Sequence, residues 1–267
     1  GLQKLMNICE SYATKWRMKF NPTKTKCTRI GKPELQNSPS WQIDGETITL
    51  TDETTILGVN FTKNLKANSH IENRIRACNQ SVFKFTSAGL SYPGLNCEVK
   101  THIWNTINCP VLTYGLETIQ ISNSELGDLK SAQGSIVKRG LGLSKRSHYH
   151  RVLQACNINP VEVVISNNTA RLYHNIFQCD TSAKEFQALL LSSYILTGKA
   201  EHGTLLDRVI KSGHEPLNLI FNKPKFPRQA TEEDGMVDSL KHLLHHENYQ
   251  TPWSQEHILA TLLTKCF

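Results

Sequence analysis

The chain has 267 residues, of which 39% are hydrophobic and 20% are charged. This composition is ordinary for a globular protein of one large or two modest domains, and no apolar run approaches the length of a membrane span. The net charge of +7 suits a polyanionic partner. Residues 1–151 hold 20 Lys and Arg against 11 Asp and Glu, whereas residues 200–267 hold 7 against 9. Any nucleic-acid surface is therefore expected in the first half.

The eight cysteines form no C-x-x-C pair, and their spacing is scattered. With no signal peptide at the start of the sequence, we interpret them as reduced intracellular thiols, mostly buried as small apolar groups. The expected location is the nucleus or the cytoplasm, without secretion and without a membrane partner. The first residue is Gly1 rather than Met, and it opens inside a helical pattern. This indicates a fragment of a longer chain.

The first 62 residues predict one helix followed by small β-structure. Apolar residues recur at spacings of three and four on one helix face: Leu2, Leu5, Met6, Cys9, Tyr12, Ala13 and Trp16. Asn21 and Pro22 end this helix. A short strand is expected at residues 27–30, and a hairpin around Asp44-Gly45, a dipeptide typical of two-residue turns. The run TTILGVNF, residues 54–61, predicts a further extended segment.

From residue 67 onward the pattern becomes helical. The four helices expected first cover residues 69–85, 97–117 with a break at Pro110, 124–143, and 159–177 with Pro160 near its first turn. The apolar faces expected on the first three are Ile71, Ile75, Cys78, Val82 and Phe85; then Val99, Ile103 and Ile107; then Leu126, Leu129, Ile136 and Val137. Four more helices are expected at residues 185–196, 204–211, 234–246 and 255–266, with a Pro-punctuated connector at 212–235.

The stretch KWRMKFNPTKTKCTRIGK, residues 15–32, carries seven basic side chains and no acidic one. Contact with a phosphate backbone needs such clustered cations, because each neutralised phosphate releases condensed counterions. The alternative is a solvated charge run, and composition alone leaves both interpretations open. The candidate contact residues in this stretch are Lys15, Arg17, Lys19, Lys24, Lys26 and Arg29.

Several motifs follow one another along the chain. They are Asn21-Pro22-Thr23-Lys24-Thr25-Lys26, then Ile56-Leu57-Gly58-Val59, then His70-Ile71, then the Pro-x-Leu-x-Tyr-Gly step within residues 103–119, and then a helix, LGL and a basic turn before the next helix. In this order they resemble the late palm and thumb of reverse transcriptases from non-LTR (LINE-type) retrotransposons. That family has an N-x-x-K-T-K turn, a Leu-Gly hairpin called the primer grip, and then thumb helices. The resemblance covers roughly residues 1–178.

The resemblance implies an α+β fold, in which a truncated reverse-transcriptase palm end (helix, strand and β-hairpins) precedes an all-α thumb and a helical C-terminal region. The implied domains are residues 1–65 for the palm end with its primer-grip-like hairpin, 66–180 for the thumb and 181–267 for a helical region of unknown role. The implied partners are an RNA template with a DNA primer, or an RNA–DNA duplex, together with the palm and fingers that precede this region in the family.

One departure from the family concerns catalysis. Polymerase chemistry needs paired carboxylates that hold two divalent metal ions. In the family these aspartates lie on strands before the helix that would begin at Leu2. This chain has no Asp-Asp pair, and its first aspartate is Asp44, in a predicted turn. The complete parent polymerase would use Mg²⁺, whereas this chain is expected to hold no metal or cofactor and to be inactive alone.

The resemblance assigns roles to particular residues. Lys24 matches the turn lysine that lies near the incoming triphosphate and acts as a general acid toward pyrophosphate, and Lys26 takes that place if the register shifts by two. Leu57 and Gly58 match the primer-grip turn, where a missing side chain lets the backbone approach the primer. A bulge glycine is the alternative for Gly58.

A second group of cations is expected to contact the template–primer backbone from the thumb. Its members are Lys138, Arg139, Lys145, Arg146 and Arg151. The alternative is a solvated helix end next to Gly140 and Gly142, whose pattern predicts helix termination rather than a dinucleotide loop. His242 and His246 stand at a zinc-compatible spacing, but the sequence shows no third ligand, which favours a solvated pair. Two other functions stay open: a host-adopted nucleic-acid-binding module, and a helical interaction protein with an exposed apolar groove.

Overall fold

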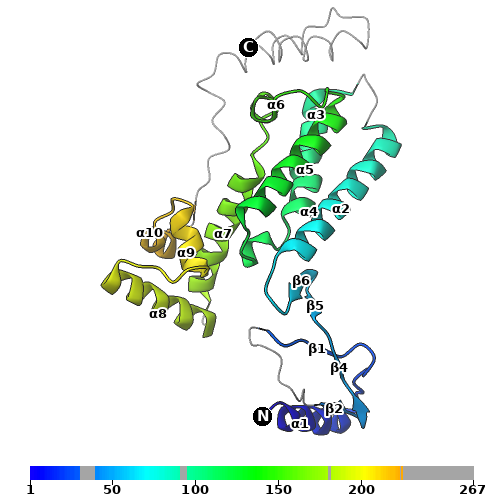
Figure 1. Cartoon of the computed structure of the whole chain (residues 1–267), viewed down its shortest axis with the longest axis vertical. Coiled ribbons are helices and arrows are strands. Elements are labelled where there is room, and N and C mark those ends of the chain that lie inside the picture. Colours follow the sequence, from blue (N-terminus) through cyan, green and yellow to red (C-terminus); the bar gives the residue numbers. More distant parts are fainter. Residues whose placement is uncertain (31–39, 91–94, 180–181, 223, 225–267) are drawn as a thin grey trace, which may run out of the picture. The chain divides into compact units, whose positions relative to one another are not determined.

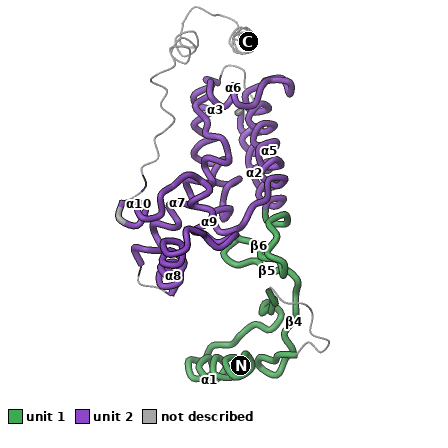
Figure 2. Tube along the Cα trace, turned by 60° about the vertical axis from the view of Figure 1, so that its left-hand side comes forward, with its two compact units in different colours: residues 1–70 green, residues 71–267 purple. Residues whose placement is uncertain are grey.

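The computed structural model describes residues 1–30, 40–90, 95–179, 182–222 and 224. Helices dominate, and short strands accompany them in the first 62 residues (Figure 1). The mixed α+β class is therefore as predicted. The chain divides into two compact units, residues 1–70 and the residues from 71 onward (Figure 2). Each unit is described below by itself.

The first unit opens with helix α1 (Leu2–Lys15), which confirms the predicted helix, but the helix ends at Lys15 and not at the predicted Asn21 and Pro22. The helix forms without much cover from the rest of this unit. Of its predicted apolar face, only Ala13 is buried, while Leu5, Tyr12 and Trp16 remain exposed. The Gln3 side chain fastens α1 to strand β2 (Gln42–Ile43), because it donates to the Gln42 carbonyl at 2.9 Å and accepts the Gln42 N–H at 3.0 Å.

Strand β2 pairs with β3 (Glu46–Thr47) in the predicted hairpin. Asp44 and Gly45 have φ values of 51° and 78°, the left-handed conformations that this two-residue turn requires. Strand β1 (Lys26–Cys27) runs parallel to β4 (Thr49–Leu50) and is shorter than the strand predicted at residues 27–30. Its partner strand is also only two residues long, so the backbone pairing between the two strands ends at Cys27.

Residues 54–61 were expected from their pattern to form one extended segment, and this prediction is wrong, whereas the turn expected at Leu57-Gly58 is present. They fold into a hairpin of β5 (Glu53–Ile56) and β6 (Val59–Thr62), because Leu57 and Gly58 take φ values of 50° and 79° and reverse the chain. Gly58 is therefore a turn glycine, and the bulge alternative is wrong. The hairpin is fastened to buried His70, whose Nδ1 atom accepts the Asn60 N–H at 3.3 Å.

The second unit contains most of α2 (Asn68–Phe85) and α5 (Asn123–Leu141). After α2, the chain at Thr86–Leu90 is kinked at Gly89, whose φ is 106°. The faces predicted for both helices supply buried residues, namely Ile71, Cys78, Val82, Leu129, Ile136 and Val137. Figures 1 and 2 show α2 and α5 side by side, and Arg139 Nη2 donates to Asn79 Oδ1 at 3.5 Å between them. The Ser122 and Glu125 pair caps α5 reciprocally, which stabilises its first turn.

The predicted break at Pro110 does not occur. Helix α3 (Cys97–Ile103) continues through a wide turn (Trp104–Asn108) into α4 (Cys109–Thr113). Pro110 falls at the second residue of α4, directly after the wide turn, so its missing N–H lies where the helix changes its repeat. The chain leaves the helix only at Tyr114, followed by Gly115 with φ of 77°. A short 3₁₀ turn (Leu116–Thr118) comes next.

The apolar face predicted for this segment is also wrong. Val99 and Ile107 are exposed, whereas Trp104, Asn108 and Leu112 are buried. The wide turn has more residues per turn than an α-helix, so the buried side chains recur every four residues. The buried face is therefore rotated around the helix axis. This face, rather than the one with Val99, packs against α5.

The remaining helices are α6 (Tyr149–Ala155), which was not predicted, α7 (Val161–Gln178), α8 (Ser182–Thr197), α9 (Leu205–Lys211) and α10 (Pro216–Phe221). Pro160 immediately precedes α7, as expected. Helix α10 lies within the predicted connector at 212–235, so the prediction of a connector is wrong for residues 216–221.

A buried cluster joins α7 to α8, α9 and α10: Ala170, Tyr173, Leu191, Leu205, Leu206, Val209 and Leu219. The helices predicted at 234–246 and 255–266 lie outside the described residues.

The cysteines differ in burial. Cys78, Cys109 and Cys156 are buried, Cys27 and Cys97 are half-buried, and Cys9 and Cys179 are exposed. All seven are free thiols, while Cys266 lies outside the described residues. The prediction that the cysteines are mostly buried therefore holds for three of them and is wrong for the two exposed ones.

Candidate nucleic-acid interface

The first basic cluster, defined as Lys15, Arg17, Lys19, Lys24, Lys26 and Arg29, begins where α1 ends. Arg17 takes a left-handed φ of 55°, its N–H donates to the Thr14 carbonyl at 3.1 Å, and the Met18 N–H donates to the Ala13 carbonyl at 2.8 Å. This is a Schellman closure with arginine at the position that usually holds glycine. The strained closure turns the chain sharply, and it leaves Lys15, Arg17 and Lys19 exposed.

Lys24 lies on a turn organised by Asn21. The Oδ1 atom of Asn21 accepts the Lys24 N–H at 3.2 Å and the Thr23 hydroxyl at 2.6 Å. The Asn21 carbonyl also accepts the Thr25 N–H at 3.0 Å and the Thr25 hydroxyl at 2.9 Å. Such side-chain bonds hold an Asx turn in one conformation. The backbone beneath Lys24 is therefore fixed, while its side chain remains exposed.

Lys26 follows directly in β1, where it pairs with Thr49 in register. Lys15, Arg17, Lys19, Lys24 and Lys26 make no ion pair with another residue in the described ranges. Their charges are thus not neutralised by the carboxylates that the structure describes. Arg29 is half-buried. These cations follow one another along the chain, from the end of α1 through the Asn21 turn to β1 and the residues just after it.

The tip of the β5–β6 hairpin exposes an apolar residue in a strained conformation. Leu57 is 88% exposed, and its φ of 50° is the left-handed region that side-chain-bearing residues avoid at a cost of about 1–2 kcal/mol. Ile56 beside it is also exposed. The Leu57 side chain therefore buries little apolar surface, and the hairpin tip is a candidate position for contact.

The second basic cluster, defined as Lys138, Arg139, Lys145, Arg146 and Arg151, surrounds the end of α5 and the start of α6. Helix α5 ends in a Schellman closure, with Gly142 at φ of 74° and the Leu143 N–H donating to the Lys138 carbonyl at 2.8 Å. The prediction of helix termination here is confirmed at Gly142, while Gly140 lies inside α5.

The structure holds the parts of this second cluster against one another. The Nζ atom of Lys138 donates to the Lys145 carbonyl at 3.2 Å, so this cation also stabilises the turn between α5 and α6. The turn is closed by the Ser147 N–H, which donates to the Ser144 carbonyl at 3.0 Å. Lys145, Arg146 and Arg139 are exposed, whereas Lys138 and Arg151 are half-buried. The exposed three are the members best placed to meet a phosphate.

Sequence reasoning missed Gln133, a buried residue that positions this second cluster. Its Oε1 atom accepts the Tyr149 hydroxyl at 2.5 Å and the Val161 N–H at 2.9 Å, and its Nε2 donates to the Asn159 carbonyl at 2.9 Å. One amide thereby joins α5 to the starts of α6 and α7. Burial is the first cause that raises the pKa of Tyr149 above its ordinary value, so the phenol remains a proton donor.

His148 and His150 were also missed. Both are exposed and flank Tyr149, and the Tyr149 and His150 rings meet edge to face with centroids 4.9 Å apart. The signal available in the sequence was the run KRSHYHR, in which three aromatic rings stand between cations. Such interleaving is typical of surfaces where bases stack beside a contacted backbone.

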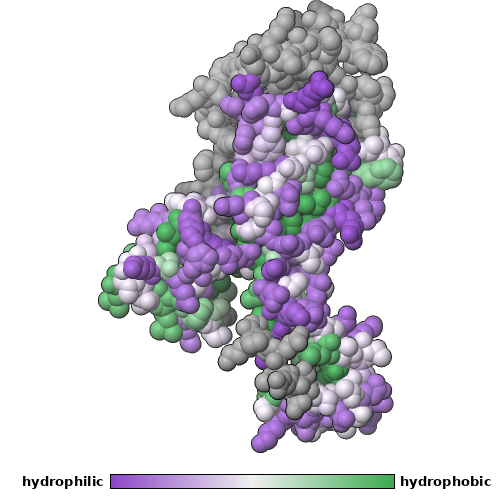
Figure 3. Space-filling model, viewed as in Figure 1, coloured by the Kyte–Doolittle hydropathy of each residue, from purple (hydrophilic) through white to green (hydrophobic). Residues whose placement is uncertain are grey.

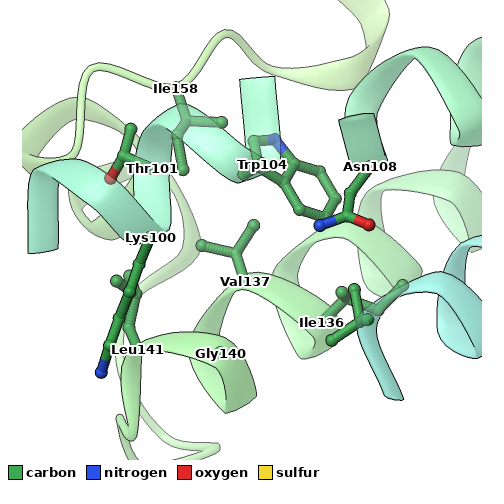
Figure 4. A pocket seen from close by; sticks show the side chains of 10 residues that line it. Lys100, Thr101, Trp104, Asn108, Ile136, Val137, Gly140, Leu141 and Ile158 are labelled. Carbon is green, nitrogen blue, oxygen red and sulfur yellow. The ribbon is translucent and has the colours of Figure 1, made fainter. Parts of the chain in front are cut away.

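The helical unit also contains a small pocket between α3, α5 and Ile158 (Figure 4). Its volume is about 20 Å³, and Trp104, Asn108 and Val137 are among its lining residues. This space suits about one water molecule. The pocket is too small for a nucleotide, so the basic surfaces remain the candidates for ligand contact.

Within the described ranges, no three His, Cys, Asp or Glu side chains come together in a group that could hold a metal ion. His242 and His246 lie outside those ranges. None of the described helices is both long enough and apolar enough to cross a membrane. In comparisons with family models, curated proteins and solved structures, none matches this chain.

Proposed function

We propose that this chain binds the sugar–phosphate backbone of an RNA–DNA template–primer duplex, as the palm end, primer grip and thumb of a non-LTR retrotransposon reverse transcriptase. The observation that carries the proposal is Lys24, an exposed cation on a turn whose backbone is fixed by Asn21. A lysine presented by a rigid turn loses less conformational freedom on meeting a phosphate than one on a loose loop.

The neighbours of Lys24 support the same proposal. Lys15, Arg17, Lys19 and Lys26 are exposed and make no ion pair with a described residue, so their charges are available to displace counterions. The order of elements also supports it. A helix, an Asn-started turn, a strand and a Leu-Gly hairpin precede the long helix α2, which is the order that the resemblance implies.

The second basic cluster supports contact from the helical unit. Arg139, Lys145 and Arg146 are exposed at the junction of α5 and α6, with the exposed rings of His148 and His150 nearby in the chain. Cations contact phosphates, and rings stack on bases, without regard to base sequence. The proposed binding is therefore independent of the base sequence of the nucleic acid.

The proposal assigns no chemical step to this chain in the absence of the rest of the polymerase. Two-metal catalysis needs clustered carboxylates, and in the described ranges no such group forms. Mg²⁺ would be held by residues of the complete polymerase, where it would activate the primer hydroxyl and neutralise the leaving pyrophosphate. In that setting Lys24, or Lys26, would donate a proton to the pyrophosphate. A host-adopted binding module would use the same surface and dispense with this step.

Salt-dependent binding tests the proposal directly. We would measure the affinity for a fluorescent RNA–DNA hybrid by anisotropy at several salt concentrations, for the unaltered chain and for Lys24→Ala/Lys26→Ala. Each lost phosphate contact lowers the slope of log affinity against log salt by about 0.7–0.9, so the double variant is expected to lose roughly 1.5.

The matched control is Lys199→Ala, because Lys199 is exposed after α8 and outside both basic clusters. It is expected to leave the slope unchanged. If the unaltered chain shows no binding even at low salt, or if Lys199→Ala weakens binding as much as the double variant, the proposal is wrong.

One observation favours a second candidate, a helical protein-interaction role. Helix α8 exposes Phe186, Leu189, Ile195 and Leu196, and Figure 3 shows apolar surface over this helix. Monomeric proteins rarely expose such a group of large apolar side chains without a partner. Leu189→Glu/Leu196→Glu would abolish partner capture under this second candidate and leave hybrid binding unchanged. The Lys24→Ala/Lys26→Ala variant would show the reverse pattern.

A further inference from the structure

Helix α1 leaves two aromatic rings uncovered within the first unit. The side of the helix that carries Gln3 and Glu10 is hydrogen-bonded to the β2–β3 hairpin (Figure 1). Ala13, three residues after Glu10, is buried. On another side of the helix, Tyr12 and Trp16 are 59% and 60% exposed. Aromatic residues that are more than half exposed remain available for contact with a ligand.

The two rings lie one helical turn apart and beside each other. Their centroids are 6.1 Å apart and their planes meet at 48°, so the rings do not stack face to face. The Trp16 N–H donates to the Tyr12 carbonyl at 3.2 Å and to the Ala13 carbonyl at 3.1 Å. Arg17 then closes the helix end with its left-handed φ of 55°. Both rings are therefore attached to a backbone that the helix end fixes.

The charges next to the two rings in the sequence are positive. Lys15 and Arg17 flank Trp16, and Lys19 follows shortly after. All three cations are exposed and make no ion pair with a described residue. Glu10 is the one acidic residue in positions 1–30, and its Oε1 atom accepts a backbone N–H of the hairpin. Exposed rings among cations are typical of surfaces that bind single-stranded nucleic acid, because rings stack on bases while cations contact phosphates.

We propose that an unpaired stretch of nucleic acid binds to this surface, the α1 platform, defined as Tyr12, Lys15, Trp16, Arg17 and Lys19. The two rings stack on bases, and the three cations contact the phosphates. A duplex cannot use the rings in this way, because its bases stack on one another and present only their edges. The inference rests on the proposed function and adds a class of ligand to it, namely the template strand where it extends unpaired beyond the primer.

A protein partner is the alternative occupant of this side of α1. Leu5 and Ile8 continue the exposed apolar surface toward the start of the helix, at 60% and 65% exposure. A protein that docks on α1 would bury these two residues together with the rings. The platform cations instead gather around Trp16, whereas Lys4 is the one cation near Leu5. Because Leu5 lies about 16 Å from Trp16 along the helix, it is the position that separates the two ligands.

A strand without bases provides the test. We would measure by fluorescence anisotropy the affinity for an oligothymidylate and for an abasic strand of the same length and charge. The unaltered chain should bind the oligothymidylate more tightly. Trp16→Ala should lower this preference roughly 5-fold or more, with the affinity for the abasic strand unchanged. Leu5→Ala is the matched control, because it shortens an exposed apolar side chain of α1 outside the platform, and it should leave both affinities unchanged.

Trp16→Phe keeps a ring at this position and provides the measurement if the alanine variant fails to fold. The oligothymidylate should quench part of the tryptophan fluorescence of the unaltered chain. This quenching should disappear in Trp16→Phe, whereas much of the preference for bases should remain.

The outcomes distinguish the inference from the proposed function. Equal affinities of the unaltered chain for the two strands, an unchanged preference in Trp16→Ala, or unchanged quenching in Trp16→Phe would each overturn the inference, while binding to the RNA–DNA hybrid would still support the proposed function. An equal loss in Leu5→Ala would also contradict stacking, because it is expected of a surface that a protein covers. Absence of binding to both strands and to the hybrid would contradict the inference and the proposed function together.

Discussion

The hydroxyl of Tyr149 donates to the Oε1 atom of Gln133, a glutamine that is completely buried in α5. The same amide accepts the Val161 N–H and donates to the Asn159 carbonyl. Three segments around the second basic cluster therefore depend on one side chain. Gly134 allows this arrangement, because a Cβ atom there would lie 2.9 Å from the Tyr149 ring.

Replacement of Gln133 by leucine should destabilise the helical unit. Leucine has a similar size but leaves the buried Val161 N–H, the Asn159 carbonyl and the Tyr149 hydroxyl without their partner. Each unsatisfied buried group costs about 1–3 kcal/mol, so the free energy of unfolding should fall by roughly 3 kcal/mol. Urea denaturation measures the change. Gln80→Leu, at an exposed position of α2, should change stability by less than about 0.5 kcal/mol.

The turn at Leu57-Gly58 should respond oppositely to two substitutions. Leu57→Asn is expected to stabilise the β5–β6 hairpin by about 0.5–1 kcal/mol, because asparagine tolerates the left-handed φ that leucine avoids. Gly58→Ala should destabilise it by roughly 1 kcal/mol for the converse reason. Hydrogen exchange of the Val59–Thr62 amides reports both changes.

The other hairpin supplies the control for this comparison. Its turn already has Asp44 before Gly45, so Asp44→Leu should cost about as much as Leu57→Asn gains. If Leu57→Asn stabilises the hairpin and weakens hybrid binding, the exposed leucine serves contact rather than folding. A lower protection of the Val59–Thr62 amides in Leu57→Asn would refute the turn assignment.

The second basic cluster should contribute to binding independently of the first. Lys145→Ala/Arg146→Ala removes two exposed cations from the turn between α5 and α6. Under the proposed function, the slope of log affinity against log salt should fall by roughly 1.5, with equal losses on hybrids of unrelated sequence. Losses that differ strongly among sequences would show that this turn reads bases and does not merely contact the backbone.

Acid stability should depend on Asp207. Burial alone would raise the pKa of this carboxylate, but the hydrogen bonds from Lys211 Nζ at 2.8 Å and from the Gly203 N–H at 2.9 Å lower it below its ordinary value. A carboxylate with a lowered folded-state pKa contributes stability above its unfolded pKa of about 4, and this contribution disappears as the pH falls through the folded pKa.

The test of this dependence compares Asp207→Asn with the unaltered chain. The variant should be less stable at neutral pH, and its stability should fall less steeply below about pH 4 than that of the unaltered chain. Melting temperatures at several pH values measure both effects. Asp128→Asn, at an exposed position of α5, is the control, and a parallel fall in all three proteins would exclude the role of Asp207.

Local patterns were sufficient for many elements. Helices α1, α2, α5, α7 and α9 were predicted from apolar spacing, and the Asp44-Gly45 turn from the dihedral preferences of those residues. The segment around Trp104 was predicted less well. Its wide turn shifts the buried face away from Val99, and nothing in the apolar spacing signals where a helix changes its repeat.

By itself, the sequence determined where most of the longer helices lie, that the chain reverses at Asp44-Gly45, and which stretches are rich in positive charge. These features depend on residues that are close along the chain. Only the tertiary structure decided that Gln133 joins three helices and that α9 and α10 pack on α7. Such contacts join residues distant in sequence, and their geometry follows from how whole helix faces pack, which has no local signature.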